Sequence, residues 1–166
     1  MSSGDSSDPR VYVPADKEDV LNFLHEEGPF ETRAAALTFA AALGYREGRR
    51  MPFEKWDKDI RWGIFKEEGK AFLADLISAA ESSEIAIMRD ERGPERRQMF
   101  AEYANGGLAL LRELVMDKPR SAEDVILELV LVAEAPRDAL KTGTLSALAA
   151  KLEAEGSARD AGPDQD

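Results

Sequence analysis

The segment from residue 122 to residue 135 constrains the fold most, because it is apolar on nearly every side. Seven of the eight residues from 125 to 132 are Val, Ile or Leu, and only Glu128 interrupts them. Ser121, followed three residues later by Asp124, resembles a capping box and predicts that a helix begins here. A helix that is apolar around most of its circumference must be covered, so we expect it to be central or to form an oligomer interface. The expected contact residues are Val125, Leu129 and Val132.

Apolar residues recur at helical spacing through most of the remaining chain, and Gly or Pro separates one stripe from the next. Two of these helices carry specific expectations. Phe53, Trp56, Ile60 and Ile64 fall on one helical face and predict a helix that ends at Gly69. The helix that Pro94 opens is expected to kink or turn at Asn105-Gly106-Gly107 before it resumes at Leu108. The other expected helices cover residues 16–27, 31–43, 70–81 and 144–155.

Residues 10–14 precede all of these helices and read Arg-Val-Tyr-Val-Pro, an alternation that predicts a short strand stopped by proline. The predicted fold is therefore mainly α, with a short N-terminal strand followed by about six packed helices in a single domain over residues 10–155. Within it, residues 10–44 resemble a ribbon-helix-helix unit and residues 45–155 form a helical bundle. The polar tails, 1–9 and 156–166, are expected to be disordered.

Charge and composition narrow the classes of partner. The formal net charge is −11, of which residues 1–9 carry −2 and residues 153–166 carry −4, so the part between them holds about −5. An autonomous nucleic-acid binder is usually strongly basic, so any DNA contact is expected to be local. The absence of cysteine excludes a disulfide framework and fits a reducing compartment. With neither a signal peptide nor a membrane-spanning run in the sequence, we expect a cytoplasmic protein.

The sequence offers no recognisable catalytic constellation, so we expect a protein that is not an enzyme and needs no cofactor or metal. The single histidine, His25, lies beside two glutamates and is interpreted as a surface residue. Gly106-Gly107 lacks the strand and the lysine of a phosphate-binding loop. Pairs such as Asp57 and Asp59 lie on different sides of the expected helix, and solvation explains them.

The order of strand, helix, Gly-Pro turn and helix at the N-terminus is that of ribbon-helix-helix proteins, in which two chains pair their strands into a ribbon that enters the major groove. Arg10 and Tyr12 share one face of the strand, so in such a dimer they would point at base edges. Thr32 and Arg33 open the second helix and would lie near a phosphate. Arg46, Arg49 and Arg50 would clamp the backbone. In the alternative interpretation, the strand is an edge strand and the arginines cover acidic neighbours.

Several longer runs resemble a known family. They are Gly-Pro-Phe-Glu-Thr at 28–32, Phe-Ala-Ala-Ala-Leu-Gly at 39–44, Gly-Arg-Arg-Met-Pro-Phe-Glu-Lys at 48–55 and Phe-Ala-Glu-Tyr-Ala-Asn-Gly-Gly-Leu at 100–108. Together they resemble the DNA phosphorothioation-associated proteins, specifically the fourth of them. The resemblance implies an accessory role beside bacterial systems that place sulfur in the DNA backbone, and beside the restriction systems that use this mark against phage. It transfers no catalytic residues. The small DNA-binding subunit of that machinery is itself similar to ribbon-helix-helix proteins.

Three functions from different classes follow. The first is a non-catalytic accessory protein of a phosphorothioate modification or restriction system. It is expected to contact other proteins of a defence gene cluster, with DNA as a further candidate partner. The second is a ribbon-helix-helix regulator of transcription. The third is an acidic DNA mimic, which ranks lower because acidic residues alternate with lysine and arginine. A homodimer or higher oligomer is expected in the first two cases.

Overall fold

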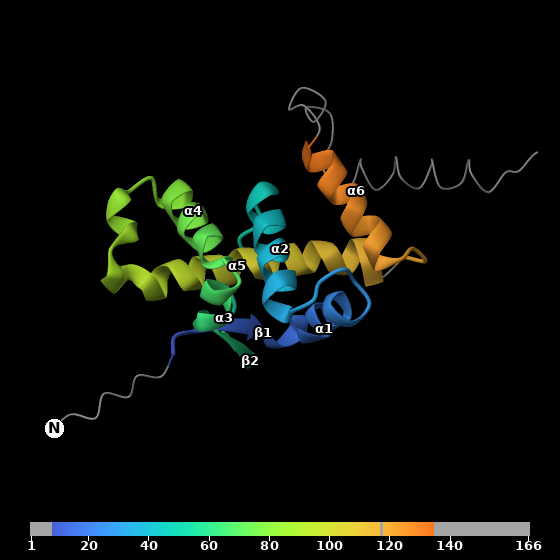
Figure 1. The fold of residues 1–166 in the computed structure, drawn as a ribbon, viewed down its shortest axis with the longest axis horizontal. Coiled ribbons are helices and arrows are strands. Elements are labelled where there is room, and N and C mark those ends of the chain that lie inside the picture. The colour runs from blue at the N-terminus through green and yellow to red at the C-terminus, as the bar shows by residue number, and fades with distance from the viewer. Residues whose placement is uncertain (1–7, 117, 135–166) are drawn as a thin grey trace, which may run out of the picture.

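The computed structural model describes residues 8–116 and 118–134, and Figure 1 shows their arrangement. The two strands are β1 (Arg10–Pro14) and β2 (Trp56–Arg61). The α-helices in the described part of the chain are α1 (Glu18–Glu26), α2 (Arg33–Arg46), α3 (Trp62–Glu67), α4 (Ala71–Ser82), α5 (Gly93–Leu111) and α6 (Ala122–Glu134). Short 3-10 turns occupy Ala15–Lys17, Ile85–Met88 and Asp90–Arg92, and a π-helical turn follows α5 at Arg112–Met116.

The prediction of a mainly α single domain with a short N-terminal strand is confirmed. The expected tails fall almost entirely on residues 1–7 and 135–166, outside the described residues, and so does the helix expected at 144–155. Those expectations stay predictions.

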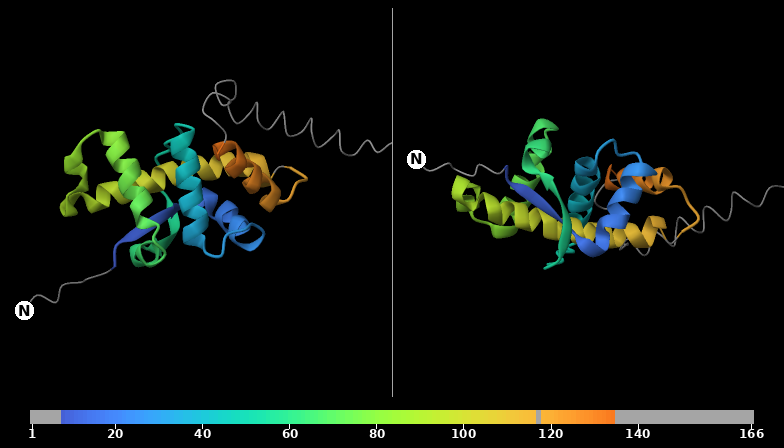
Figure 2. Two further views of the ribbon diagram at one scale, coloured as in Figure 1. Left: turned by 45° about the horizontal axis from the view of Figure 1, so that its top comes forward. Right: turned by 90° about the horizontal axis from the view of Figure 1, so that it is seen from below.

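Helix α5 is the longest element and runs through the middle of the molecule, with α4 toward one end and α6 toward the other (Figures 1 and 2). Its most extensive packing is against α2, which crosses it. The crossing is close because glycines face backbone on both sides. A Cβ on Gly44 of α2 would lie 2.0 Å from the carbonyl oxygen of Tyr103, and one on Gly107 would lie 1.7 Å from that of Ala40. No side chain fits in such gaps, so these positions require glycine.

This packing corrects the expected break at Asn105-Gly106-Gly107. Helix α5 continues through all three residues, and they are buried in it. Glycine weakens a helix by about 1 kcal/mol relative to alanine, which is why the pair suggested an interruption. Here the close approach of α2, and of the Arg49 carbonyl to Gly106, compensates for that cost. The family-like runs at 39–44 and 100–108 therefore meet at one helix crossing.

The helix predicted from Phe53 to Gly69 is wrong in its first half. Residues Trp56–Arg61 form β2, which pairs antiparallel with β1, and only Trp62–Glu67 is helical. Val11 lies opposite Ile60 and Tyr12 opposite Asp59, with an irregularity in register at Val13 and Pro14. As the alternation predicts, Val11 and Val13 are buried while Arg10 and Tyr12 are exposed.

The core lies between the β1–β2 ribbon, α1, α2 and α5. An aromatic cluster at its centre joins α3 to α5, since the rings of Trp62 and Phe65 both contact that of Phe100. Phe65 and Phe100 are completely buried. The ribbon lies across α5 (Figure 2), and the valines of β1 close the core from that side.

Candidate functional site

The outward face of the ribbon carries an exposed aromatic pair. Tyr12 of β1 and Trp56 of β2 contact each other with ring centroids 4.5 Å apart and planes inclined by 34°. Their side chains remain 41% and 46% exposed. Two large aromatic residues that lie together at the surface, outside the core, indicate a binding surface more than a packing role.

This pair forms part of the wall of a groove between the ribbon and the first half of α5. The groove has a volume of about 550 Å³, within the range typical of ligand sites. Its lining comes from β1 and the residues before it, from the loop that leads into β2, and from α5. The lining residues are Asp8, Pro9, Arg10, Tyr12, Phe53, Trp56, Pro94, Arg97, Gln98, Ala101 and Glu102.

Arg97 supplies the groove with a cation that has no carboxylate partner among the described residues. Its guanidinium carbon lies 5.9 Å from the centroid of the Trp62 ring, a cation–π contact. Partial burial, together with the charge of Arg96, lowers the pKa of Arg97. Arg96 itself forms an ion pair with Asp75 at 2.9 Å and donates to the carbonyl oxygens of Ile87 and Arg89. Of these two adjacent arginines, only Arg97 is left available to an anion.

Arg10 and Tyr12, which the sequence places in a DNA-binding face, both line the groove. The Nη1 of Arg10 lies 2.6 Å from an Oδ of Asp59 across the ribbon, so its charge is largely compensated. The strand that pairs with β1 is β2 of the same chain, and not β1 of a second copy as the ribbon-helix-helix expectation requires.

Arg50, expected to clamp a phosphate, is held by a polar network within the chain. Its Nε donates to a carboxylate oxygen of the buried Glu102 at 2.5 Å, and an Oε of Glu81 lies 3.6 Å from its Nη1. Burial pulls the pKa of Arg50 down, but the hydrogen bond and charge of Glu102, with that of Glu81, more than offset it and raise the pKa. Gln98 donates to the other oxygen of Glu102 at 3.0 Å. For Arg50, the alternative interpretation of an arginine that covers acidic neighbours describes the contacts.

The same network fixes the loop after α2 on α5. The backbone N–H of Met51 donates to the carbonyl oxygen of Glu102 at 3.0 Å, and the Asn105 side chain donates to the Met51 carbonyl oxygen at 2.9 Å. Tyr103 donates its hydroxyl proton to Glu81 at 2.6 Å. Burial, reinforced by that hydrogen bond and the Glu81 charge, raises the pKa of Tyr103 to about 12.

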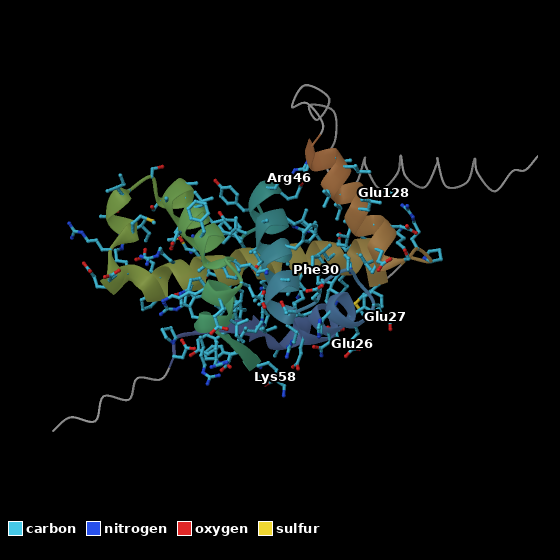
Figure 3. The ribbon with its side chains drawn as sticks, in the orientation of Figure 1. Glu26, Glu27, Phe30, Arg46, Lys58 and Glu128 are labelled. Carbon is cyan, nitrogen blue, oxygen red and sulfur yellow. The ribbon has the colours of Figure 1, made fainter. Side chains whose placement is uncertain are left out.

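Two further predicted DNA contacts, Arg46 and Arg49, do not line the groove. Arg49 is exposed, with only a 4.0 Å approach to Glu113. Arg46 lies at the far end of α2, on the opposite side of the molecule from Lys58 of β2 (Figure 3). The structure therefore brings Arg10 and Tyr12 together at the groove, and Arg46 is not part of its lining.

Thr32 and Arg33 occupy the start of α2, where the sequence places them. The Thr32 hydroxyl oxygen accepts from the backbone N–H of Ala35 at 3.0 Å, so Thr32 is the N-cap of the helix, and it donates to Glu68 at 3.0 Å. Arg33 approaches Glu18 only to 4.0 Å, and two of its guanidinium nitrogens are buried without a hydrogen-bond partner in the described part of the chain. A second, more open cavity of about 500 Å³ is lined by both of them together with Arg10 and the half-buried His25, so the structure brings Arg10, Thr32 and Arg33 to one surface.

The residues expected to contact a partner on α6 are covered by the chain itself to different degrees. Val125 and Leu129 are buried within the chain, and Val132 is half-buried. The apolar residues left exposed are Leu127, Val130 and Leu131, at 57%, 40% and 56%. The sequence correctly indicates that the helix is covered, but two of the three residues chosen for a partner, Val125 and Leu129, are buried within the chain.

Sequence reasoning missed Arg97, Trp56 and Phe53 as groove residues. The helical spacing places Trp56 and Phe53 on the buried face of a helix over a stretch that is not helical, whereas Trp56 is exposed and Phe53 is only partly buried. Arg97 stands in a run of two arginines after Glu95, and nothing in that run indicates which guanidinium would be left without a carboxylate.

The described residues contain no group of three or more acidic or histidine side chains placed to hold a metal ion. No helix within residues 8–116 or 118–134 is long and apolar enough to cross a membrane.

The described part of the chain is mainly helical, with a groove that has an exposed aromatic pair and a guanidinium without a carboxylate partner. A family model described as DNA sulphur modification system-associated protein 4 matches residues 10–146. The chain belongs to this family, as its sequence runs indicate. No curated protein and no solved structure matches the chain.

Proposed function

We propose that this protein is a non-catalytic accessory component of a DNA sulphur modification system, which contacts DNA and other proteins of the same gene cluster. Membership of the family supports the association with such a system. The observation that carries the binding role is the half-exposed pair Tyr12 and Trp56 beside Arg97, whose guanidinium has no carboxylate partner among the described residues. Aromatic faces and an available guanidinium are the side chains by which proteins hold nucleic acid.

Contacts with partner proteins are assigned to α6. Leu127, Val130 and Leu131 are exposed on one side of it, while Ile126 and Leu129 anchor the opposite side in the core. An apolar stripe on a helix that is already anchored suits docking against another apolar surface. In a defence cluster, such a surface would hold the protein to the modification or restriction subunits.

The association is tested by co-purification. The tagged chain is expressed with the sulphur modification and restriction proteins encoded beside it and isolated at low and high salt. Retention of at least one of them, and its loss in the variant Leu127→Ser/Leu131→Ser, is the expected result. If none is retained under either condition, the accessory role is wrong.

The ribbon-helix-helix regulator is the alternative that the sequence raised. It requires β1 to pair with β1 of a second copy, whereas β1 pairs with β2 of its own chain. The outward position of Arg10 and Tyr12 is shared by both functions and does not favour the regulator.

A further inference from the structure

The groove between the ribbon and α5 has a composition that distinguishes among nucleic-acid ligands. A duplex offers its phosphates and base edges, but its base faces are stacked on one another. An unpaired nucleotide offers the flat face of its base and a single nearby phosphate. The aromatic surface of Tyr12 and Trp56 is complementary to a base face, and Phe53 adds a further ring to the lining.

The surrounding charge also disfavours a duplex. A duplex presents one negative charge for roughly every 1.7 Å of its length and needs many cations to neutralise it. Residues 10–152 carry about −5, and the cations of the groove are Arg97 and the Asp59-paired Arg10. One available guanidinium is enough for one phosphate but not for a track of them.

The lining of the groove also includes two carboxylates, those of Glu102 and Asp8. Glu102 is paired with Arg50 and accepts a further hydrogen bond from Gln98, so its charge is compensated within the chain. Asp8 lies at the N-terminal edge of the groove, close to Gly63 of α3. Arg97 itself is partly withdrawn from water, with its guanidinium over the Trp62 ring and no carboxylate partner among the described residues, and an anion would restore the interactions that burial removed.

We propose that this groove binds one unstacked nucleotide of single-stranded DNA, with the base on Tyr12 and Trp56 and the adjacent phosphate on Arg97. The proposal rests on the DNA contact put forward under Proposed function, and it names the ligand of that same site. It predicts binding with little dependence on sequence, because every base has a face that can stack.

The experiment compares a fluorescein-labelled ten-nucleotide thymidine strand with a blunt twenty-base-pair duplex, using fluorescence anisotropy of the full chain at low salt. The single strand should bind at least about tenfold more tightly than the duplex, and it should quench tryptophan fluorescence. Trp62 is 8% exposed and Trp56 is 46% exposed, so Trp56→Leu should remove the quenching. Loss of one stacking ring should weaken binding about 5- to 100-fold.

Arg97→Gln should weaken binding about tenfold, since it removes a charge-assisted hydrogen bond, and Arg97→Lys should recover part of it. Trp56→Phe, which keeps a stacking ring, should also retain most of the affinity and shows whether the leucine variant failed through misfolding. Phe72→Leu is the matched control, because Phe72 is a 66% exposed aromatic residue of α4 outside the groove.

Each other outcome overturns the nucleotide proposal. Duplex binding as tight as single-strand binding would refute it while leaving the DNA contact of the proposed function in place. Binding of neither DNA would refute both. If the chain bound a lysine-rich peptide and did not bind the single-stranded DNA, the aromatic residues and Asp8 of the groove would be assigned to a cationic partner. Affinity for the strand that is unchanged in the Trp56→Leu and Arg97→Gln variants would place the contact elsewhere.

Discussion

The carboxylate of Glu102, buried in α5, accepts a hydrogen bond at 2.5 Å from the Nε of Arg50, which lies in the loop after α2. Replacing Arg50 by alanine would leave a buried carboxylate with Gln98 as its only side-chain donor. The Arg50 side chain is 35% exposed, so water would partly compensate for the loss. We expect a decrease of about 1–3 kcal/mol in the free energy of unfolding, measured by urea titration.

Arg49→Ala is the matched control, because Arg49 is the adjacent arginine and its only ion pair, with Glu113, spans 4.0 Å between exposed side chains. It should change stability by no more than about 0.5 kcal/mol. Equal effects of the two variants would show that the loop is not held by the Arg50–Glu102 pair.

A second prediction concerns the crossing of α2 and α5. An alanine at position 107 would place its Cβ 1.7 Å from the carbonyl oxygen of Ala40, where neither backbone can yield without separating the helices. Gly107→Ala should therefore lower the free energy of unfolding by about 3 kcal/mol or more, as overpacked cores do. Thermal unfolding followed by circular dichroism measures it.

Gly63→Ala provides the comparison for that variant. Its Cβ would meet only the flexible carboxylate of Asp8 at 2.9 Å, and alanine is the better helix former. The stability of this variant should stay within about 1 kcal/mol of the wild type. A Gly107→Ala protein as stable as Gly63→Ala would contradict the close crossing.

These glycines also show where sequence patterns mislead. The spacing of apolar residues predicted α1, α2, α4 and α6 well. Each of these helices buries one face, and the apolar residues of that face recur at helical spacing in the sequence. Gly106 and Gly107 carry the opposite local signal, since glycine disfavours a helix. Their helical conformation depends on contact with α2 and the loop after it. A single sequence does not indicate that contact.

The sequence did not predict strand β2 of the ribbon, because this strand also depends on a tertiary contact. Trp56, Ile60 and Ile64 are spaced four apart, as on a helix, and the Asp and Lys residues between them have low strand propensity. The strand forms because β1 supplies a partner more than forty residues away in the sequence. Half of the candidate site, Arg10 and Tyr12, followed from the alternation of β1 alone, whereas Trp56 and Arg97 required the tertiary structure.

Tyr103 gives the protein an alkaline pH dependence. Its pKa is raised to about 12 in the folded chain against an ordinary value of 10.0. Between these values the unfolded chain releases the phenolic proton while the folded chain keeps it, so rising pH favours unfolding. The contribution is fully present below pH 10 and is lost as the pH approaches 12, and it amounts to about 1–3 kcal/mol.

Tyr103→Phe tests this dependence, since phenylalanine fills the same space and does not titrate. The wild type should exceed the variant in stability below pH 10, and urea titrations at increasing pH should show the difference shrinking toward pH 12. A difference that stayed constant over this range would contradict the raised pKa.

Variants of Thr32, the N-cap of α2, distinguish a structural role of this residue from a DNA contact. Thr32→Ala removes the oxygen that accepts from the Ala35 N–H and should cost about 1 kcal/mol of stability. Thr32→Ser keeps that oxygen and should restore most of the loss in chemical denaturation. If Thr32 acted at a phosphate instead, the alanine variant would keep wild-type stability and lose only DNA affinity.

The two sides of α6 make the last prediction. Leu129 is 4% exposed and packs in the core, so Leu129→Ala should lower the free energy of unfolding by about 2–5 kcal/mol. Leu131, two residues on, is 56% exposed, and Leu131→Ser should change stability by about 0.5 kcal/mol or less. If the exposed stripe is an interface between copies or with a partner, Leu131→Ser should instead lower the mass measured by light scattering or the yield of co-purified protein. A serine variant that destabilises the monomer and leaves association intact would place Leu131 in the core and remove α6 as the docking surface.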